Sequence, residues 1–202
     1  MNLPNALTLI RLPLTFAIVA LMYGTWPWAA TLAFWLYIAA AITDWLDGKL
    51  ARERNSVSDF GKFMDALVDK VLVIGIMVAL LDLGYLRLPG AFVIMLVLMV
   101  ITREFMISGL RMMAAARGVV MAAERGGKVK TIIQLTSLGF LLCEPMLARD
   151  LPRISPFPLD GAVWLAHWTG LVLFFVSMWF MFSSMWSYYR KYRHVLFDEP
   201  AA

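Results

Sequence analysis

Residues 44–69 read DWLDGKLARERNSVSDFGKFMDALVD and place four aspartates inside or at the ends of two strongly apolar segments: Asp44, Asp47, Asp65 and Asp69. An ionisable side chain at membrane depth costs several kcal/mol on most scales. Four carboxylates close together also repel one another unless a cation neutralises them. The stretch therefore predicts a metal site in or near a lipid bilayer.

Composition places the surrounding chain in a membrane. Of its 202 residues, 61% are hydrophobic and 16% are charged, whereas soluble chains are nearer half apolar and a quarter charged. The net charge of +4 suits an anionic membrane surface, and the sequence contains no nucleic-acid-binding motif. We expect a single membrane domain over residues 1–202.

Apolar windows of about 20 residues, the length that crosses a hydrocarbon core, recur along the chain. Most prolines fall at or beyond the ends of these windows, where they are tolerated. We therefore expect an all-α integral membrane protein, a bundle of six transmembrane helices. The predicted helices cover approximately residues 6–23, 28–51, 61–82, 90–111, 128–147 and 162–190.

Lysine and arginine are spread unevenly over the predicted connections. Twelve of the 18 lie in the set 49–62, 111–130 and 190–202, and three lie in the opposite set 24–28, 83–89 and 148–161. The positive-inside rule puts the first set in the cytoplasm, which makes both termini cytoplasmic. Aromatic belts are expected at the outer ends, with Trp26, Trp28, Trp164 and Trp168, and at the inner end of the last helix, with Trp186, Tyr188, Tyr189 and Tyr192.

The aspartates share helix faces with small residues. Positions 44, 47, 48 and 51 are spaced i, i+3, i+4 and i+7, so two carboxylates lie with Gly48 and Ala51, and Arg52 follows. Positions 61, 65 and 69 form a second such face. The connection between these two helices is short and polar, so we expect antiparallel neighbours whose carboxylates meet at the cytoplasmic end of the membrane.

This set of ligands favours a hard cation. Carboxylates without histidine or cysteine suit Mg²⁺, Mn²⁺ or Ca²⁺ better than zinc, and four of them suffice for a two-metal clamp on a phosphoryl group. Two other interpretations stay open, namely an ion or proton pathway in a transporter and structural pairing of the aspartates with Lys49, Arg52 and Lys70. Neither explains the small residues, which let a bulky group approach the backbone.

The motif D-x2-D-G-x2-A-R-x8-G-x3-D-x3-D, from Asp44 to Asp69, resembles the signature of the CDP-alcohol phosphatidyltransferases at every specified residue and every gap. The resemblance implies a six-helix protein that holds two divalent cations, Mg²⁺ with Mn²⁺ as a substitute, at a site open to the cytoplasmic interface. It also implies CDP-diacylglycerol as the donor substrate, release of CMP, and a homodimer.

The same resemblance gives the motif residues separate roles. Asp44, Asp47 and Asp65 would be metal ligands, and Asp69 would complete the second metal site and take the proton of the acceptor hydroxyl. The CDP-diacylglycerol pocket would be lined by Asp47, Gly48, Ala51, Arg52 and Gly61. Asn5, Thr8 and Arg11 share a face by spacing, and we consider two roles for them: covering the nucleotide, or anchoring the first helix at the membrane interface.

Two basic clusters indicate an anionic acceptor. Arg103 and Arg111 lie in ITREFMISGLR, and Lys128 and Lys130 lie in GGKVKT. Arg103 follows a long apolar run, so membrane topology alone explains it poorly. Adjacent helical residues point about 100° apart, so we expect no salt bridge between Arg103 and Glu104. A phosphate on the acceptor suits these four cations better than serine, choline or ethanolamine.

These segments and the opening NLPNALTLIR resemble the branch of the family whose acceptor is sn-glycerol 3-phosphate. The resemblance implies transfer of the phosphatidyl group from CDP-diacylglycerol to sn-glycerol 3-phosphate, in a bacterial cytoplasmic (inner) membrane with the site facing the cytoplasm. Phosphatidylglycerol, as in cardiolipin synthesis, and inositol phosphate stay open as acceptors because both are anionic. An ion-coupled transporter, which would release no CMP, is the alternative from a different class.

Overall fold

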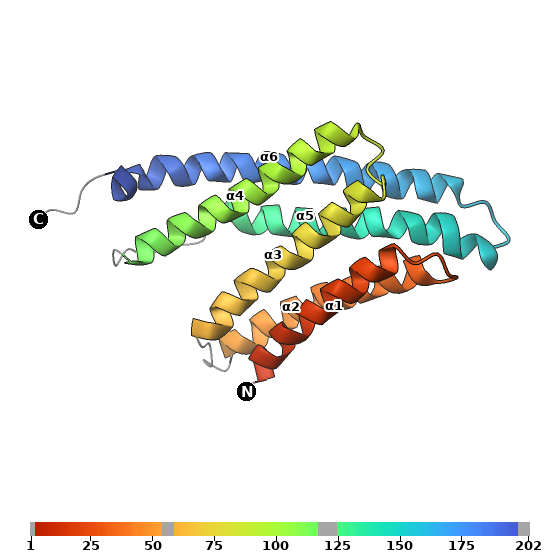
Figure 1. The fold of residues 1–202 in the computed structure, drawn as a ribbon, viewed down its shortest axis with the longest axis horizontal. Helices are drawn as coiled ribbons and strands as arrows, with labels where there is room; N and C mark the ends of the chain where they lie inside the picture. Colours follow the sequence, from red (N-terminus) through yellow and green to blue (C-terminus); the bar gives the residue numbers. More distant parts are fainter. Residues whose placement is uncertain (1–2, 54–58, 117–124, 198–202) are drawn as a thin grey trace, which may run out of the picture.

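The computed structural model describes residues 3–53, 59–116 and 125–197, and it describes side chains over 10–43, 64, 67–114 and 129–191. Six α-helices fill the described ranges, which confirms the expected all-α fold (Figure 1). They are α1 (Leu3–Met22), α2 (Ala29–Glu53), α3 (Asp59–Asp82), α4 (Gly90–Ala116), α5 (Arg125–Pro145) and α6 (Asp160–Phe197). A π-helical turn, η1 (Met146–Asp150), and a 3₁₀ turn, η2 (Leu151–Arg153), connect α5 to α6.

Three segments of the described chain are long and apolar enough to cross a membrane: Gly90–Ala114, Val129–Arg153 and Asp160–Lys191. Two shorter apolar helices, Ile10–Met22 and Ala29–Thr43, accompany them. These lengths and compositions are those of an integral membrane protein. The six-span count and the cytoplasmic placement of both termini stay predictions.

The helices form two groups that diverge toward the chain ends (Figure 1). α5 and α6 lie side by side along their length, and α4 crosses them at a slant, in contact with α6 and α3. α1 packs against both α2 and α3. Buried apolar side chains from all six helices join the groups in one core, with Ile18, Tyr37, Ile76, Leu138 and Phe174 fully enclosed.

Close contact between α5 and α6 depends on Gly170. A methyl group at this position would meet the side chain of Leu141 at 2.8 Å and its backbone nitrogen at 3.1 Å. The same approach lets the Ser137 hydroxyl donate to the carbonyl oxygen of Gly170 at 2.7 Å. A small residue at a helix crossing with an interhelical hydrogen bond is a common way to join helices in lipid.

Hydrogen bonds tie together the connections at one end of the molecule. Asp150 accepts the backbone N–H groups of Trp28 and Thr31, at 3.2 and 2.8 Å, and thereby caps the start of α2. Arg149 donates to the carbonyl oxygen of Gly24 and to the hydroxyl of Tyr85. The α1–α2, α3–α4 and α5–α6 connections therefore share one end, as the alternating pattern of spans predicts.

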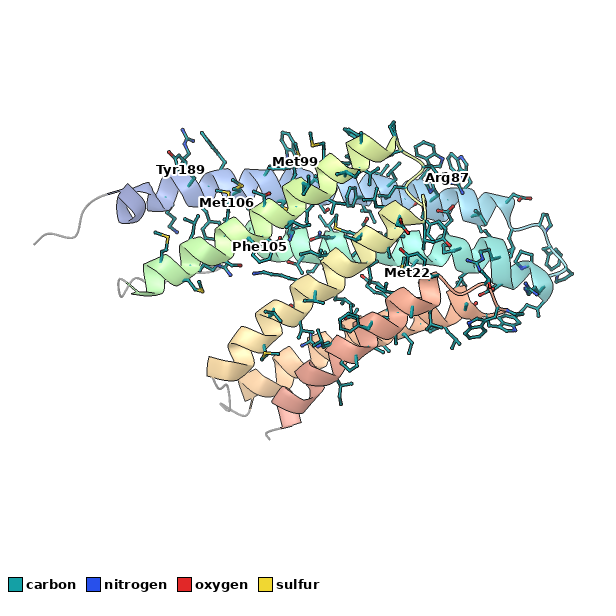
Figure 2. The ribbon with its side chains drawn as sticks, viewed as in Figure 1. Met22, Arg87, Met99, Phe105, Met106 and Tyr189 are labelled. Carbon is teal, nitrogen blue, oxygen red and sulfur yellow. The ribbon has the colours of Figure 1, made fainter. Side chains whose placement is uncertain are left out.

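A buried carboxylate joins three elements at this same end. Glu144, near the end of α5, accepts from Arg87 of the α3–α4 connection and lies 2.8 Å from Nδ1 of His167 on α6. Figure 2 shows Arg87 projecting from that connection. Glu144 and His167 are buried, whereas Arg87 is exposed. This cluster fixes the separation of α4, α5 and α6 where their connections meet.

The surface is strongly apolar, as contact with lipid requires. Along α4, Met99, Phe105 and Met106 are exposed (Figure 2). The predicted belt residues described at the surface are Trp26, Trp28, Trp164, Trp168, Trp186 and Tyr189. The prediction that Tyr188 is an interfacial anchor is wrong. Its side chain is 1% exposed, because its ring packs with Ile107 of α4. Tyr192 lies outside the described side chains.

Candidate active site

The aspartate motif lies on two regular helices. α2 runs unbroken through positions 44, 47, 48 and 51, and α3 through positions 61, 65 and 69. Helical spacing therefore puts each set on one face, as the sequence predicts. The motif residues whose side chains lie outside the described part are Asp44, Asp47, Gly48, Ala51, Arg52, Gly61 and Asp65. Their predicted contacts, and the meeting of the two faces, stay predictions.

The side chain of Asp69 is described, and it accepts a hydrogen bond from Arg11 of α1. Nη1 of Arg11 donates to Oδ1 of Asp69 at 2.8 Å, and the arginine side chain is 1% exposed while the aspartate is 44% exposed. An arginine so deeply buried cannot anchor α1 at the membrane interface, so that interpretation is wrong for Arg11. The structure brings Arg11 to the aspartate motif instead. Thr8, on the preceding turn, lies outside the described side chains.

The motif fits a divalent cation by its chemistry and helical register. Two carboxylates one turn apart on each of two helices supply hard oxygen ligands. Asp69 combines an exposed carboxylate with an oxygen oriented by Arg11. Among the side chains that the structure describes, no three acidic, histidine or cysteine groups gather, and three of the four aspartates fall outside that set.

Arg103 and Lys130 both bind Glu104. Nη1 of Arg103 lies 3.1 Å from Oε1 of Glu104, and Nζ of Lys130, on α5, donates to the same oxygen. The expectation that Arg103 and Glu104 do not pair is therefore wrong. Their Cβ atoms diverge around the helix, but both side chains are long and flexible enough for their ends to converge. Nη2 of Arg103 also donates to Ser184 of α6 at 2.8 Å.

Lys70 adds a third cation from α3. Its Nζ donates to Oγ of Ser108 on α4, and Ser108 in turn donates to the backbone carbonyl of Glu104 at 2.8 Å. The sequence assigns no binding role to Lys70. The sequence does contain a signal that Lys70 lies near the site, because Lys70 directly follows Asp69 and Ser108 lies one turn after Glu104. Pattern alone does not show that α3 and α4 meet there.

The four predicted acceptor residues do not share one environment. Arg103 and Lys130 are buried beside Glu104. Arg111 is exposed and donates to the Tyr188 hydroxyl at 2.9 Å, with its guanidinium over the Tyr188 ring. Lys128 lies outside the described side chains. The structure thus brings two of the four together, and adds Lys70 to them.

The two parts of the site are joined by consecutive residues of α3. Asp69 belongs to the aspartate motif and contacts α1, while Lys70 contacts α4. A carboxylate able to take a proton or bind a cation therefore stands one helical step from a cluster able to bind an anion. Such a pairing suits transfer of a phosphoryl group between two anionic substrates.

Comparison with known proteins agrees with this chemistry. A family model described as CDP-alcohol phosphatidyltransferase matches residues 1–186. The chain belongs to the CDP-alcohol phosphatidyltransferase family.

Its similar relatives carry a more specific description. A CDP-diacylglycerol–glycerol-3-phosphate 3-phosphatidyltransferase of Bacillus subtilis is 36% identical over 198 residues, 92% of this chain and 95% of the relative. The protein of that description in Escherichia coli is 34% identical over 203 residues, 98% of each chain. A rice cardiolipin synthase (CMP-forming) is 31% identical over 97% of this chain but 59% of its own length.

Proposed function

We propose that this protein transfers the phosphatidyl group of CDP-diacylglycerol to sn-glycerol 3-phosphate, giving phosphatidylglycerol phosphate and CMP. The observation that carries the proposal is similarity along nearly the full length of both chains to phosphatidyltransferases described by that reaction. The aspartate motif supplies the site for the donor, and the cations near Glu104 supply a site for an anionic acceptor.

Four aspartates would hold two divalent cations, Mg²⁺ or Mn²⁺: Asp44, Asp47, Asp65 and Asp69. When bound, these cations offset the charge of the donor pyrophosphate and of the departing phosphate. The pocket for CDP-diacylglycerol comprises Asp47, Gly48, Ala51, Arg52 and Gly61, with Thr8 and Arg11 on its α1 side. Small residues at three of these positions admit the nucleotide close to the backbone.

The chemical step is a direct displacement. The 1-hydroxyl oxygen of glycerol 3-phosphate forms a bond to the phosphorus that carries the diacylglycerol, and the bond from that phosphorus to the CMP oxygen breaks. Asp69 accepts the hydroxyl proton, and Arg11 keeps its carboxylate oriented through the contact at Oδ1. Arg52 contacts the phosphate oxygens as charge moves onto the leaving group. Positioning of the two substrates and electrostatic stabilisation of the transition state account for most of the rate enhancement, as in other phosphoryl transfers.

The acceptor phosphate binds the basic residues on α3, α4 and α5. Arg103 and Lys130 pair with Glu104, Lys70 lies nearby on α3, and Lys128 and Arg111 extend the positive charge toward the ends of their helices. Arginine and lysine are both common phosphate ligands. An acceptor without net negative charge, such as serine or choline, would leave Glu104 as the counter-ion of these cations.

We place the protein in a bacterial cytoplasmic (inner) membrane as a single domain of six spans. Both termini and the site face the cytoplasm, where soluble glycerol 3-phosphate meets the lipid donor. The excess of lysine and arginine on that side supports this orientation. We further propose a homodimer, as the family resemblance implies.

One assay tests the reaction. The purified protein is supplied with CDP-diacylglycerol, Mg²⁺ and one acceptor at a time, and CMP is measured. We expect CMP with glycerol 3-phosphate and a lipid product with a free phosphate monoester. CMP with inositol phosphate alone would overturn the acceptor assignment. Absence of CMP release with every acceptor tested would refute the enzymatic proposal and return attention to an ion-coupled transporter.

A second candidate acceptor is phosphatidylglycerol, favoured by the similarity to a cardiolipin synthase. That similarity covers little more than half of the relative's length. The same assay with phosphatidylglycerol vesicles tests it directly, since cardiolipin and CMP would form together.

A further inference from the structure

Two hydroxyl groups of α6 each accept a hydrogen bond from an arginine of α4. Nη2 of Arg103 donates to Oγ of Ser184 at 2.8 Å. Nη2 of Arg111 donates to the hydroxyl of Tyr188 at 2.9 Å. Ser184 and Tyr188 lie one turn apart on α6, so they share one helix face. Ile107, between the two arginines on α4, packs on Tyr188 and shows that this face of α6 meets α4.

The Ser184 hydroxyl is oriented as an acceptor. It donates its own proton to the backbone carbonyl of Met181, one turn earlier, at 3.0 Å. The lone pairs of Oγ are therefore left for the guanidinium group of Arg103. Ser184 and Arg103 are 4% and 6% exposed, and a hydrogen bond to a charged group is stronger where water is excluded.

A hydroxyl partner affects an arginine differently from a carboxylate partner. Both fix the direction of the guanidinium group, but only the carboxylate offsets its charge. Glu104 already accepts one N–H of Arg103, and Ser184 adds a second fixed direction without a second negative charge. Among the described side chains Arg111 has no carboxylate partner, and its guanidinium lies 5.6 Å from the centre of the Tyr188 ring. The α6 hydroxyls therefore orient both arginines without neutralising them.

We propose that Ser184 and Tyr188 are positioning residues for the acceptor, and that they act through Arg103 and Arg111. Their hydroxyl groups set the directions in which the two arginines present N–H groups to the acceptor phosphate. Neither hydroxyl needs to contact the substrate itself. The acceptor side of the protein then includes α6 as well as α3, α4 and α5. This inference rests on the proposed function.

Removing the Ser184 hydroxyl should weaken binding of the acceptor and leave binding of the donor intact. We expect Ser184→Ala to raise the KM for glycerol 3-phosphate about tenfold, the equivalent of one hydrogen bond to a charged group. Its KM for CDP-diacylglycerol should be unchanged, and its kcat should fall less than the first KM rises. Ser184→Thr keeps a hydroxyl and should restore most of the loss. An unchanged KM for glycerol 3-phosphate in Ser184→Ala would overturn the proposal.

Ser177→Ala is the matched control. Ser177 lies two turns before Ser184 on α6, is also buried, and also donates to a carbonyl one turn earlier, that of Phe174, at 2.7 Å. Among the described side chains it has no arginine partner. A packing defect in α6 would therefore affect both variants, whereas loss of the arginine contact affects only Ser184→Ala. Equal rises in the KM for glycerol 3-phosphate would show a structural role and refute the proposal.

Tyr188→Phe tests the second hydroxyl and keeps the ring that packs on Ile107. We expect the KM for glycerol 3-phosphate to rise about threefold, because Arg111 loses one hydrogen bond but keeps its contact with the ring. Tyr37→Phe is the control, since its buried hydroxyl donates to the carbonyl of Leu135 at 2.6 Å. The same KM in both variants would refute the role of Tyr188. This pair keeps the proposal testable if Ser184→Ala fails to fold.

A double-mutant cycle tests whether Ser184 acts through Arg103. Arg103→Met removes every donor of the guanidinium group but retains a long side chain. In that background Ser184→Ala should cause no further rise in the KM for glycerol 3-phosphate, because residues that act through one contact are not additive. A further rise of about tenfold in the double variant would mean that Ser184 acts independently of Arg103, and would refute the positioning role.

These results are separable from failure of the proposed reaction. If the protein released no CMP with glycerol 3-phosphate, the reaction itself would be refuted. If it released CMP with a KM that Ser184→Ala and Tyr188→Phe left unchanged, the reaction would stand and the positioning role of the α6 hydroxyls would be refuted.

Discussion

Arg11 and Asp69 join α1 to α3 through a contact of 2.8 Å between Nη1 and Oδ1. The arginine is almost fully buried and the aspartate is partly exposed, so the pair orients a carboxylate that faces outward from the helix. Breaking a buried hydrogen bond to a charged group costs about 1.5–3 kcal/mol. The loss of orientation should appear mainly in the rate of the reaction.

Replacing Arg11 by glutamine should lower kcat for CMP release by about 10- to 100-fold, which is the kinetic equivalent of that energy. Arg87→Gln is the control, since Arg87 also pairs with a carboxylate but at the opposite end. Normal turnover of Arg11→Gln would contradict the positioning role.

Replacing Asp69 by asparagine should lower kcat by about 10²- to 10⁴-fold, the range expected when a general base is removed. The change is nearly isosteric, and the asparagine oxygen can still accept from Arg11, but the buried arginine loses a negative partner, so the Tm is expected to fall as well. Asp82→Asn, at the other end of α3 and bonded to Tyr23, should retain its activity. An active Asp69→Asn protein would exclude Asp69 as the proton acceptor.

Chelation of divalent cations by EDTA should abolish CMP release, and Mg²⁺ or Mn²⁺ should restore it. In Asp44→Asn the Mg²⁺ concentration for half-maximal rate should rise by at least about tenfold, because even outer-shell partners of a metal cost that much. Asp160→Asn, in the first turn of α6, should keep the original requirement. An unchanged Mg²⁺ requirement in Asp44→Asn would argue against its role as a ligand.

Replacing Gly170 by alanine should destabilise the α5–α6 pair by about 1–3 kcal/mol, the usual cost of overpacking a tight contact. The added methyl group would lie 2.8 Å from Leu141 and would also strain the hydrogen bond from Ser137. Thermal unfolding in detergent measures the effect. Gly161→Ala provides the control, because a methyl group there meets no atom within 4 Å.

Local patterns in the sequence were sufficient for the helices and for the aspartate faces. Apolar length located all six helices, although α4 and α6 continue to Ala116 and Phe197, beyond the predicted ends at 111 and 190. The extension of α6, residues 191–197, is basic and aromatic and does not resemble a membrane span, whereas the extension of α4, residues 112–116, is apolar but follows the charged Arg111. Helical spacing likewise placed the motif residues correctly on α2 and α3.

Apolar length and helical spacing do not predict which side chains meet between helices. Asp150 caps α2 from a π-helical turn more than 100 residues away, and no local signal links the two. Lys70 meets Ser108 only because α3 and α4 cross. Arg103 pairs with Glu104 because long side chains can bend toward each other, which backbone spacing does not reveal.

The succession of Asp69 and Lys70 has a consequence for how such a protein can change its substrate. One peptide unit fixes the separation along α3 between Asp69, the carboxylate that we propose takes the proton, and Lys70, a cation near the proposed acceptor site. Lys70 donates to Ser108 on α4, whereas Asp69 accepts from Arg11 on α1. Mutations on α4 and α5 could therefore change which acceptor binds without moving the aspartates on α2 and α3. In this arrangement α3 sets the distance between the two parts of the site.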